Sequence, residues 1–384
     1  MDFLNSGTHK SITHKVDKQF RMILMQFELV ISQLIETSQP INSLQLNSSS
    51  LNNSSVSVNS IASDLIKDKT DANIYADDRN YDFDKNKFTI GLIAALPKEY
   101  AAIKSLLQNP KLYREPGVGA GHNYLLADLP AVDGGKHYLV LAFMADTGNN
   151  MASMRATLLC EHFPKIRSII MVGIAGGVPN HVKPEDHVRL GDVVISNKVG
   201  IIQYDLVKEE LKEIINRNPP RPPSSELLEA VGLLEAEEIL CNRQWTEYIE
   251  IALEKMNILR PSDETDILND SLDPSKVIPH PKDPNRTKNT PRIFFGPIAT
   301  SNTLLKNPIK RDDLRNKFGV KAIEMEGSGI ADAAWYHGIG YLVVRGICDY
   351  CDERINDIWQ KYAAAVASAV TKSLIESIPT RCNT

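Results

Sequence analysis

The sequence predicts an α/β protein in which helices cover both faces of a mostly parallel β-sheet. Its 384 residues, 42% of them hydrophobic and 24% charged, suffice for one large globular domain with an appendage. Short apolar segments such as TIGLIAAL and YLVVRGI have the composition of strands that are buried on both faces. Helix-like segments follow several of these strands, and this alternation is typical of parallel sheets.

The N-terminal region differs from the rest of the chain. Apolar residues recur at spacings of three and four over residues 12–36, which predicts an amphipathic helix within an N-terminal segment 1–37. Such a helix cannot bury its apolar stripe alone, so it either pairs with a copy of itself, giving a homo-oligomer (dimer or higher), or docks on the rest of the chain. Residues 38–86 are rich in Ser, Asn and Asp and predict a disordered linker.

A globular domain is expected over residues 87–380. Strands are expected at 88–95, 137–145, 168–173, 192–196, 293–298, 322–326 and 341–348, and helices at 97–108, 151–162, 327–337 and 356–378. Residues 205–292 interrupt this alternation with Pro-rich segments and two amphipathic helices at 225–239 and 245–256. We interpret them as an α-helical, Pro-rich insertion or lid.

Composition argues against several classes of partner. The net charge of −5 offers no general attraction for nucleic acid or an anionic membrane, and no run approaches the roughly 18 apolar residues of a membrane span. Five scattered cysteines suggest reduced thiols and a cytoplasmic protein. Cys348 and Cys351 form a CxxC pair, but no second pair or His pair has ligand spacing, so no metal or organic cofactor is expected.

Acidic residues lie at or just after the ends of three predicted strands. Glu99, Glu326 and Asp349 are expected at one edge of the sheet, beside the Gly-containing turns DTGNN and GIAGG. A purely structural role is the alternative for each of these three acids, since acidic side chains are favoured at the N-cap and in the first turn of a helix. Clustered carboxylates suit a reaction that develops positive charge, such as cleavage of a glycosidic bond through an oxocarbenium-like transition state.

The motifs IGLIAALPKE, GIAGGV, LGDVVIS, AIEMEG and VVRGICD, in this order, resemble the nucleoside phosphorylase superfamily. The resemblance covers about residues 88–379 without most of the insertion. It is greatest to the 5′-methylthioadenosine/S-adenosylhomocysteine nucleosidase type and to the phosphorylase-type domains of fungal and bacterial immune proteins. It implies a three-layer αβα sandwich.

The resemblance also implies roles for individual residues. Glu99 would activate the attacking water, Glu326 would bind the ribose hydroxyls with Met325 packed against the sugar, and Asp349 would protonate N7 of a purine. Leu304 and Cys348 would lie at the base with Asp349. The loop formed by Gly173, Ile174, Ala175 and Gly176 would lie near the sugar or a phosphate.

Two departures from the family pattern favour hydrolysis over phosphorolysis. Ile174 stands where phosphorolytic members similar to this chain carry a Ser, and an aliphatic side chain cannot bind phosphate. The first loop reads Leu-Pro-Lys-Glu instead of the Gly-Asp-Pro of bacterial purine phosphorylases. A phosphate-dependent phosphorylase remains the alternative, and a non-catalytic nucleotide-binding sensor is a third possibility.

The substrate is therefore expected to be a purine nucleoside or nucleotide, of the adenosine type. Immune-associated members of the family include enzymes that hydrolyse ATP, and the Arg-Pro-Pro segment of the insertion resembles theirs. Basic residues of the insertion would then contact phosphates, with Arg221 and Arg286 as the first candidates. The other basic residues available there are Arg243, Lys282 and Lys288.

Overall fold

The computed structural model describes residues 84–117, 122–217, 219, 221–354 and 357–380. The predicted N-terminal helix and all but the end of the predicted linker lie outside these residues. At the end of that linker, Asp84 caps a short 3-10 helix, Lys85–Lys87, and the ammonium of Lys85 pairs with Glu115 at 2.6 Å. The globular domain thus already includes residues just before 87.

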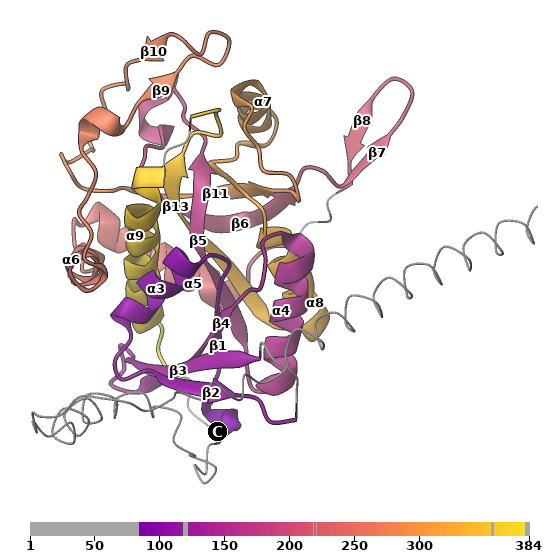
Figure 1. The fold of residues 1–384 in the computed structure, drawn as a ribbon, viewed down its shortest axis with the longest axis vertical. Coiled ribbons are helices and arrows are strands. Elements are labelled where there is room, and N and C mark those ends of the chain that lie inside the picture. Colours follow the sequence, from indigo (N-terminus) through magenta and orange to yellow (C-terminus); the bar gives the residue numbers. More distant parts are fainter. Residues whose placement is uncertain (1–83, 118–121, 218, 220, 355–356, 381–384) are drawn as a thin grey trace, which may run out of the picture. The chain divides into compact units, whose positions relative to one another are not determined.

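A nine-stranded mixed sheet forms the centre of the domain (Figure 1). Its strands are β1 (Ile90–Ala94), β2 (Lys111–Arg114), β3 (Asn123–Pro130), β4 (Lys136–Phe143), β5 (Ser168–Gly177), β6 (Val193–Gln203), β11 (Ile293–Thr300), β12 (Ala322–Glu324) and β13 (Gly340–Asp349). They lie in the order β12-β11-β6-β13-β5-β1-β4-β3-β2. The predicted α/β class and all seven predicted strands are confirmed, whereas β2 and β3 were not predicted.

The sheet is less parallel than expected. Pairings β1–β4, β1–β5, β5–β13, β6–β11 and β11–β12 are parallel, but β2–β3, β3–β4, β6–β13 and β5–β12 are antiparallel. The β5–β12 pairing departs from a simple open sandwich, because β12 also pairs with β11. The strands β5, β13, β6, β11 and β12 therefore close into a hydrogen-bonded ring.

Helices pack on the sheet in two groups. One group consists of α4 (Asn149–His162) and α8 (Gly327–His337), which pack on each other. The other is built on α9 (Asp357–Glu376), which covers β5 and β13 and packs against α3 (Pro97–Leu106), α5 (Ser225–Ile239) and α6 (Trp245–Met256). Figure 1 shows the two groups on opposite sides of the central strands.

The predicted helices at 225–239 and 245–256 are confirmed, but they do not form a lid. Trp245 is fully buried and Leu227 and Ile249 nearly so, because the apolar faces of α5 and α6 pack into the layer built on α9. The amphipathic pattern of each helix is thus explained by the domain core.

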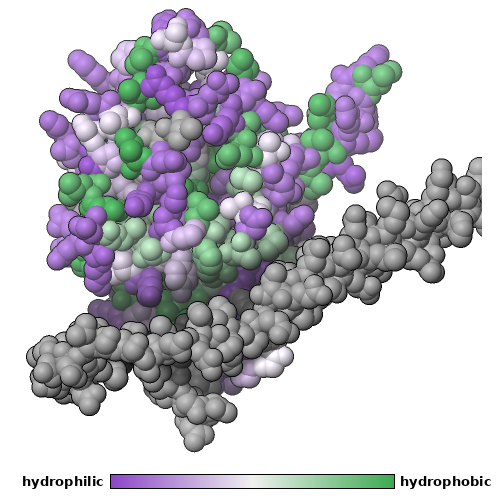
Figure 2. Space-filling view, in the orientation of Figure 1, coloured by the Kyte–Doolittle hydropathy of each residue, from purple (hydrophilic) through white to green (hydrophobic). Residues whose placement is uncertain are grey.

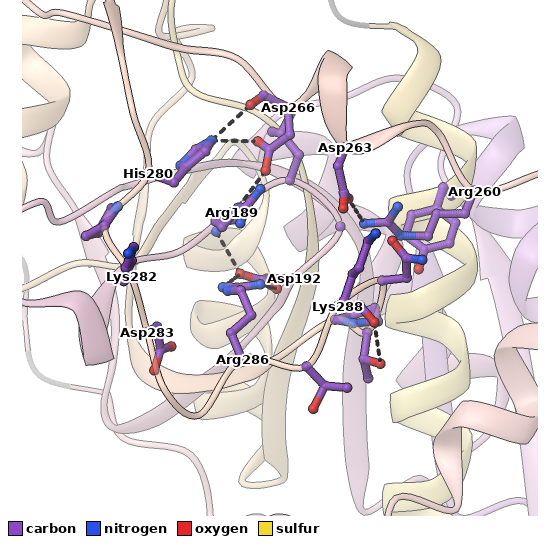
Figure 3. A pocket seen from close by; sticks show the side chains of 18 of the residues that line it. Arg189, Asp192, Arg260, Asp263, Asp266, His280, Lys282, Asp283, Arg286 and Lys288 are labelled. Carbon is purple, nitrogen blue, oxygen red and sulfur yellow. Dashed lines mark hydrogen bonds and ion pairs between the residues drawn. The ribbon is translucent and has the colours of Figure 1, made fainter.

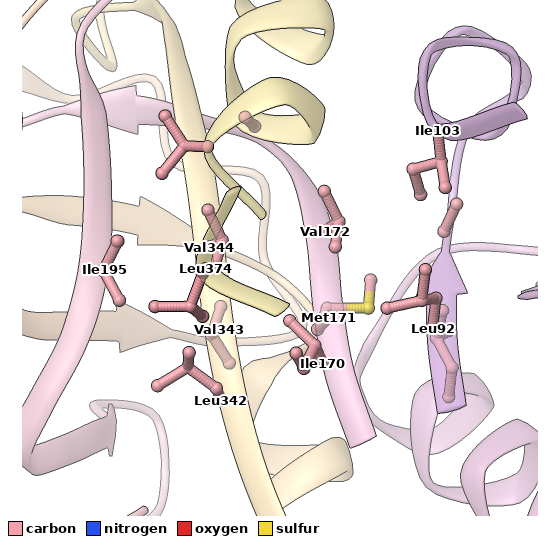
Figure 4. Close-up of a cluster of buried hydrophobic side chains, with 14 of the residues drawn as sticks. Leu92, Ile103, Ile170, Met171, Val172, Ile195, Leu342, Val343, Val344 and Leu374 are labelled. Carbon is pink, nitrogen blue, oxygen red and sulfur yellow. The ribbon is translucent and has the colours of Figure 1, made fainter. Parts of the chain in front are cut away.

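The core lies between the sheet and these helices. Figure 4 shows Leu92, Ile170, Val343 and Leu374 within one contiguous cluster of apolar side chains. Every residue of β1 is buried, and nearly every residue of β13, as expected for strands covered on both faces. Burial on both faces fixes the register of the strands that carry the site residues.

A small hairpin of β7 (Val207–Glu209) and β8 (Ile214–Asn216) projects from the domain (Figure 1). Figure 2 shows apolar side chains on this arm, where Leu211 is fully exposed and Ile214 is 61% exposed. The remaining elements are α7 (Pro308–Phe318), the two-residue strands β9 (Leu268–Asn269) and β10 (Val277–Ile278), and the 3-10 helices η3 (Pro184–Asp186) and η4 (Asp263–Thr265). Among the described residues, no helix has the length and apolar character needed to cross a membrane.

Candidate functional site

A buried arginine organises the carboxyl end of the central strands. Arg345 lies on β13, opposite Gly173 of β5, and its side chain is fully buried. Its guanidinium contacts Glu324, lies 3.0 Å from Glu326 Oε2 and 3.9 Å from Glu99 Oε1. Burial alone would lower the pKa of Arg345, but these three carboxylates raise it above its usual value, so the group stays charged.

Glu99 is fixed by backbone donors. It occupies the first turn of α3, which begins at Pro97 directly after β1. The amides of Ala95 and Leu96 donate to Oε2 at 2.9 and 2.8 Å, and the amide of Ile174 donates to Oε1 at 2.8 Å. Burial raises the pKa of Glu99, and Arg345 and these amides offset only part of that effect. The carboxyl is therefore a better proton acceptor than an ordinary surface glutamate.

Glu326 is the carboxyl whose protonation is most perturbed. The amide of Gly148 donates to its Oε1 at 3.1 Å, and Arg345 donates to its Oε2. Burial raises its pKa to about 7, with Arg345 acting in the opposite direction and Glu324 and Glu99 adding to the rise. Three glutamates around one arginine would carry two excess negative charges, so the cluster retains a proton near neutral pH.

Asp349 lies at the end of β13, beside the glycine-rich end of β5. Its Oδ1 accepts a hydrogen bond from the amide of Cys351 at 2.8 Å, and the Cys348 thiol donates to Oδ2 at 3.1 Å. Asp349 also lines a cavity of about 210 Å³ that is bounded by Tyr350, Asp352, Arg354 and residues 264, 265 and 267. The carboxyl is thus orientated by neighbours on its own chain segment, and the residue borders a cavity.

The glycines of β5 allow these groups to approach. A Cβ on Gly173 would lie 2.3 Å from both Arg345 Nη1 and Glu99 Oε1, and a Cβ on Gly176 would lie 2.9 Å from Asp349 Oδ1. Since Gly173 pairs with Arg345 and Gly176 with Asp349, one strand brings Glu99, Glu326 and Asp349 to the same edge. Glu99 and Glu326 thus meet at Arg345, and Asp349 lies further along the same two strands, β5 and β13, without a described contact to either glutamate.

The other residues expected at the site lie on β5, on β13 and on two loop segments. Ile174 and Ala175 continue β5, and Cys348 is buried beside Ala175, whose carbonyl lies 3.5 Å from its thiol. Met325 is half-buried between Glu324 and Glu326, and Leu304 is 65% exposed. No described contact joins Leu304 to the carboxylates.

Arg221 and Arg286, the expected phosphate contacts, are each paired with an acid outside this cluster. Arg221 binds Asp332 at 2.6 Å and stacks on Trp335 of α8. Arg286 binds both oxygens of the buried Asp192, at 2.9 and 2.6 Å. Local charge in a loop does not reveal which acid will neutralise it.

Three further residues of the site, Glu324, Asn149 and Arg345, were not predicted from the sequence. Glu324 accepts hydrogen bonds from the amides of Glu326 and Gly327, which fixes the start of α8. Asn149 accepts from the amide of Gly329 and thereby joins α4 to α8. Glu324 and Arg345 lie inside the motifs AIEMEG and VVRGICD, where a charge within a buried strand was the available signal. Among the described residues, no His, Cys, Asp or Glu group has the arrangement of a metal site.

Comparison with known proteins agrees with this architecture. The profile of the phosphorylase superfamily matches residues 89–376. A nucleotide-binding leucine-rich repeat (NLR)-like protein of Hyaloscypha variabilis is 30% identical over 306 residues, which are 75% of this chain but only 29% of that protein. A 5′-methylthioadenosine/S-adenosylhomocysteine nucleosidase of Mycobacterium tuberculosis is 25% identical, over 76% of this chain and 97% of the enzyme.

Solved structures share the fold, and one of them is a nucleosidase complex. The S-adenosylhomocysteine nucleosidase of Streptococcus pyogenes, in complex with 5-methylthiotubericidin, superposes with a TM-score of 0.53 at 20% identity. The match covers 77% of this chain and 98% of that structure.

Proposed function

This chain belongs to the phosphorylase superfamily, and we propose that it is an enzyme that hydrolyses the N-glycosidic bond of a purine nucleoside or nucleotide and releases the free base. One observation supports the proposal: Glu99 and Glu326 gather around Arg345 opposite Gly173, and Asp349 lies beside Gly176 of the same strand. Members of this superfamily include nucleosidases and phosphorylases, and the relative from Mycobacterium tuberculosis is a nucleosidase by name.

In the proposed reaction the bond between the sugar and the base breaks with positive charge developing on the sugar. The carboxylates around Arg345 outnumber its single positive charge, so they stabilise an oxocarbenium-like transition state. Glu99, which has a raised pKa, accepts a proton from the attacking water. Glu326 binds the ribose hydroxyls, and Asp349 donates a proton to N7 so that the base leaves as a neutral molecule.

Water is the proposed nucleophile in preference to phosphate. The amide of Ile174 donates to Glu99, so this backbone donor of the glycine-rich loop is engaged by a carboxylate. The Ile174 side chain adds no polar group, and the neighbouring glutamates repel an anion. Phosphorolysis stays the alternative that the experiment must separate.

The base is proposed to be adenine, since the nucleosidase relatives are named for adenosine compounds. The substituent at the 5′ position, including the triphosphate of ATP, is left to experiment. Purified protein would be incubated with methylthioadenosine, adenosine, inosine and ATP, each with and without phosphate, and the products would be separated by chromatography. Adenine release without phosphate is expected. Base release that requires added phosphate and yields the sugar 1-phosphate would overturn the hydrolytic proposal.

We also propose that the chain forms a homo-oligomer through the amphipathic segment 12–36. Mass measurement of the full chain and of a chain lacking residues 1–83 would test this, with a lower oligomeric mass expected after deletion. An unchanged mass would exclude this segment as the contact.

A further inference from the structure

A second cavity lies apart from the carboxylates of the candidate site. It has a volume of about 690 Å³, within the range of small-molecule sites. Its walls come from residues 189–192, from the segment 260–266, from the loop 280–291 and from Tyr362 of α9. None of Glu99, Glu326, Asp349 and Arg345 lines it, so this is a separate site.

The acids and arginines of this cavity neutralise one another pairwise. The ion pairs are Asp192 with Arg286, Asp266 with Arg189, Asp263 with Arg260, and Asp283 with Arg292. Buried Asp192 is bound by two nitrogens of Arg286, and Asp266 by Arg189 at 2.7 Å. After this pairing, no carboxylate of the cavity remains to balance a further cation.

Lys282 and Lys288 are the surplus cations. Both side chains are exposed, line the cavity and form no ion pair with the described residues. Figure 3 shows them on opposite sides of the cavity, with Arg189 and Arg286 between them. Positive groups thus follow one another across its width, an arrangement that fits a ligand with several negative groups in a row.

The cavity is connected to the acid Asp349 through one buried tyrosine. Asp266, on the cavity wall, accepts a hydrogen bond from the Tyr350 hydroxyl at 2.6 Å, and the same hydroxyl accepts from the amide of Leu190 at 3.2 Å. Tyr350 is 2% exposed and directly follows Asp349. Burial by itself would raise the pKa of Asp266, but His280, Arg189 and Tyr350 together lower it to about 2, so Asp266 is a permanent anion.

We propose that this cavity is a regulatory site for an oligophosphate, in which the anion binds Lys282 and Lys288 and competes with Asp266 for Arg189. Weaker pairing of Asp266 loosens the anchor of Tyr350 and therefore the position of Asp349. Occupancy consequently slows base release. The rate effect rests on the proposed function, whereas binding itself does not.

Binding is tested by calorimetry on the full chain with inorganic tripolyphosphate as the probe. One saturable site is expected, weakened by higher salt as charge pairing requires. The double variant Lys282→Glu/Lys288→Glu should bind about tenfold or more weakly, because two attractions become repulsions. A matched variant, Lys104→Glu/Lys198→Glu, changes the net charge equally at exposed lysines outside the cavity and should bind normally.

The calorimetric outcomes decide whether the cavity binds an anion and which kind it prefers. Absence of binding, or equal binding by both double variants, would overturn the site. A milder pair, Lys282→Gln/Lys288→Gln, replaces the Glu variant if circular dichroism shows that the latter is unfolded. Cytidine triphosphate, which has no purine to release, distinguishes a nucleotide from free polyphosphate: tighter binding than tripolyphosphate identifies a nucleotide as the ligand.

The regulatory role is tested by kinetics with a purine substrate. Tripolyphosphate should lower kcat by about fivefold in the unmodified protein, at the low end of couplings between sites. The lysine double variant should keep its kcat when the anion is added. A rise in KM alone would place the anion at the substrate site, and binding without any rate change would refute regulation. If no base is released under any condition, the proposed function fails while the calorimetric result still decides the site.

Discussion

Replacing Arg345 with methionine is expected to destabilise the domain in a strongly pH-dependent way. The guanidinium is fully buried and is the shared cation of Glu99, Glu324 and Glu326. Methionine retains much of the apolar stem but removes the charge. Breaking a buried ion pair costs about 3–5 kcal/mol, because the remaining charge is left without a partner.

The pH dependence follows from the direction of the carboxyl pKa shifts. Glu326 already has a pKa of about 7, above its ordinary value. A carboxyl with a raised folded-state pKa stabilises the fold at pH values below its unfolded-state pKa, and this contribution is lost as the pH rises through the folded-state pKa. Loss of Arg345 raises these pKa values further. The stability deficit of the variant should therefore be small near pH 5 and reach the full value of about 3–5 kcal/mol near pH 8.

Urea denaturation of both proteins at pH 5, 7 and 8 measures this deficit. Arg155→Met is the matched control, because Arg155 is also buried but donates to the Tyr124 hydroxyl and the Asn123 carbonyl instead of to carboxylates. Its deficit should change little between pH 5 and 8. An Arg345→Met deficit that is equally independent of pH would refute the charge argument and reduce Arg345 to a packing role.

Three further variants probe the site. Asp349→Asn should abolish base release, measured by chromatography, while thermal unfolding stays close to that of the unmodified protein; unchanged release would remove Asp349 as the acid. Gly173→Ala places a methyl group 2.3 Å from two site atoms and should lower both kcat and the unfolding temperature. The control Gly232→Ala has open space around its Cβ position in α5 and should stabilise the fold by about 0.5–1 kcal/mol. Equal effects of the two alanines would contradict the close approach at Gly173. Glu326→Gln should reduce the fall of unfolding free energy between about pH 4.5 and 7, since the carboxyl that titrates in this range is gone. An unchanged pH dependence in urea titrations would assign the titrating proton to another group.

The local pattern of the sequence was sufficient for most elements. The helix α8 was predicted with its observed bounds, as were α5 and α6, because their apolar spacing and their breakers lie within each segment. The helix α7 was missed because it is mostly charged and buries only Arg311 and Leu314. The strands β2 and β3 form an antiparallel hairpin at the sheet edge, outside the strand-helix alternation used for prediction.

The candidate acids were chosen from their positions at or just after the ends of predicted strands. The structure brings Glu99 and Glu326 to one arginine and leaves Asp349 beside Gly176, further along β5. What only the tertiary structure decided is how their charges are balanced. The antiparallel pairing of β12 with Gly176 and Gly177 closes the ring of strands and brings Glu324 and Glu326 to Arg345. Pairing between strands far apart in sequence depends on the competition of all strands for partners, and no periodicity within a segment encodes it.

The arginines of the insertion illustrate the same limit. The sequence showed that Arg286 is positively charged but not that buried Asp192, far from it in sequence, would neutralise it. Nor did it show that Lys282 and Lys288 would form no ion pair within the described part of the chain. The sequence by itself determined the α/β class, most of the helices and strands, and the acids at the strand ends. The tertiary structure alone decided which charges are buried against each other and which face a cavity, because Coulombic pairing acts through space and is independent of separation along the chain.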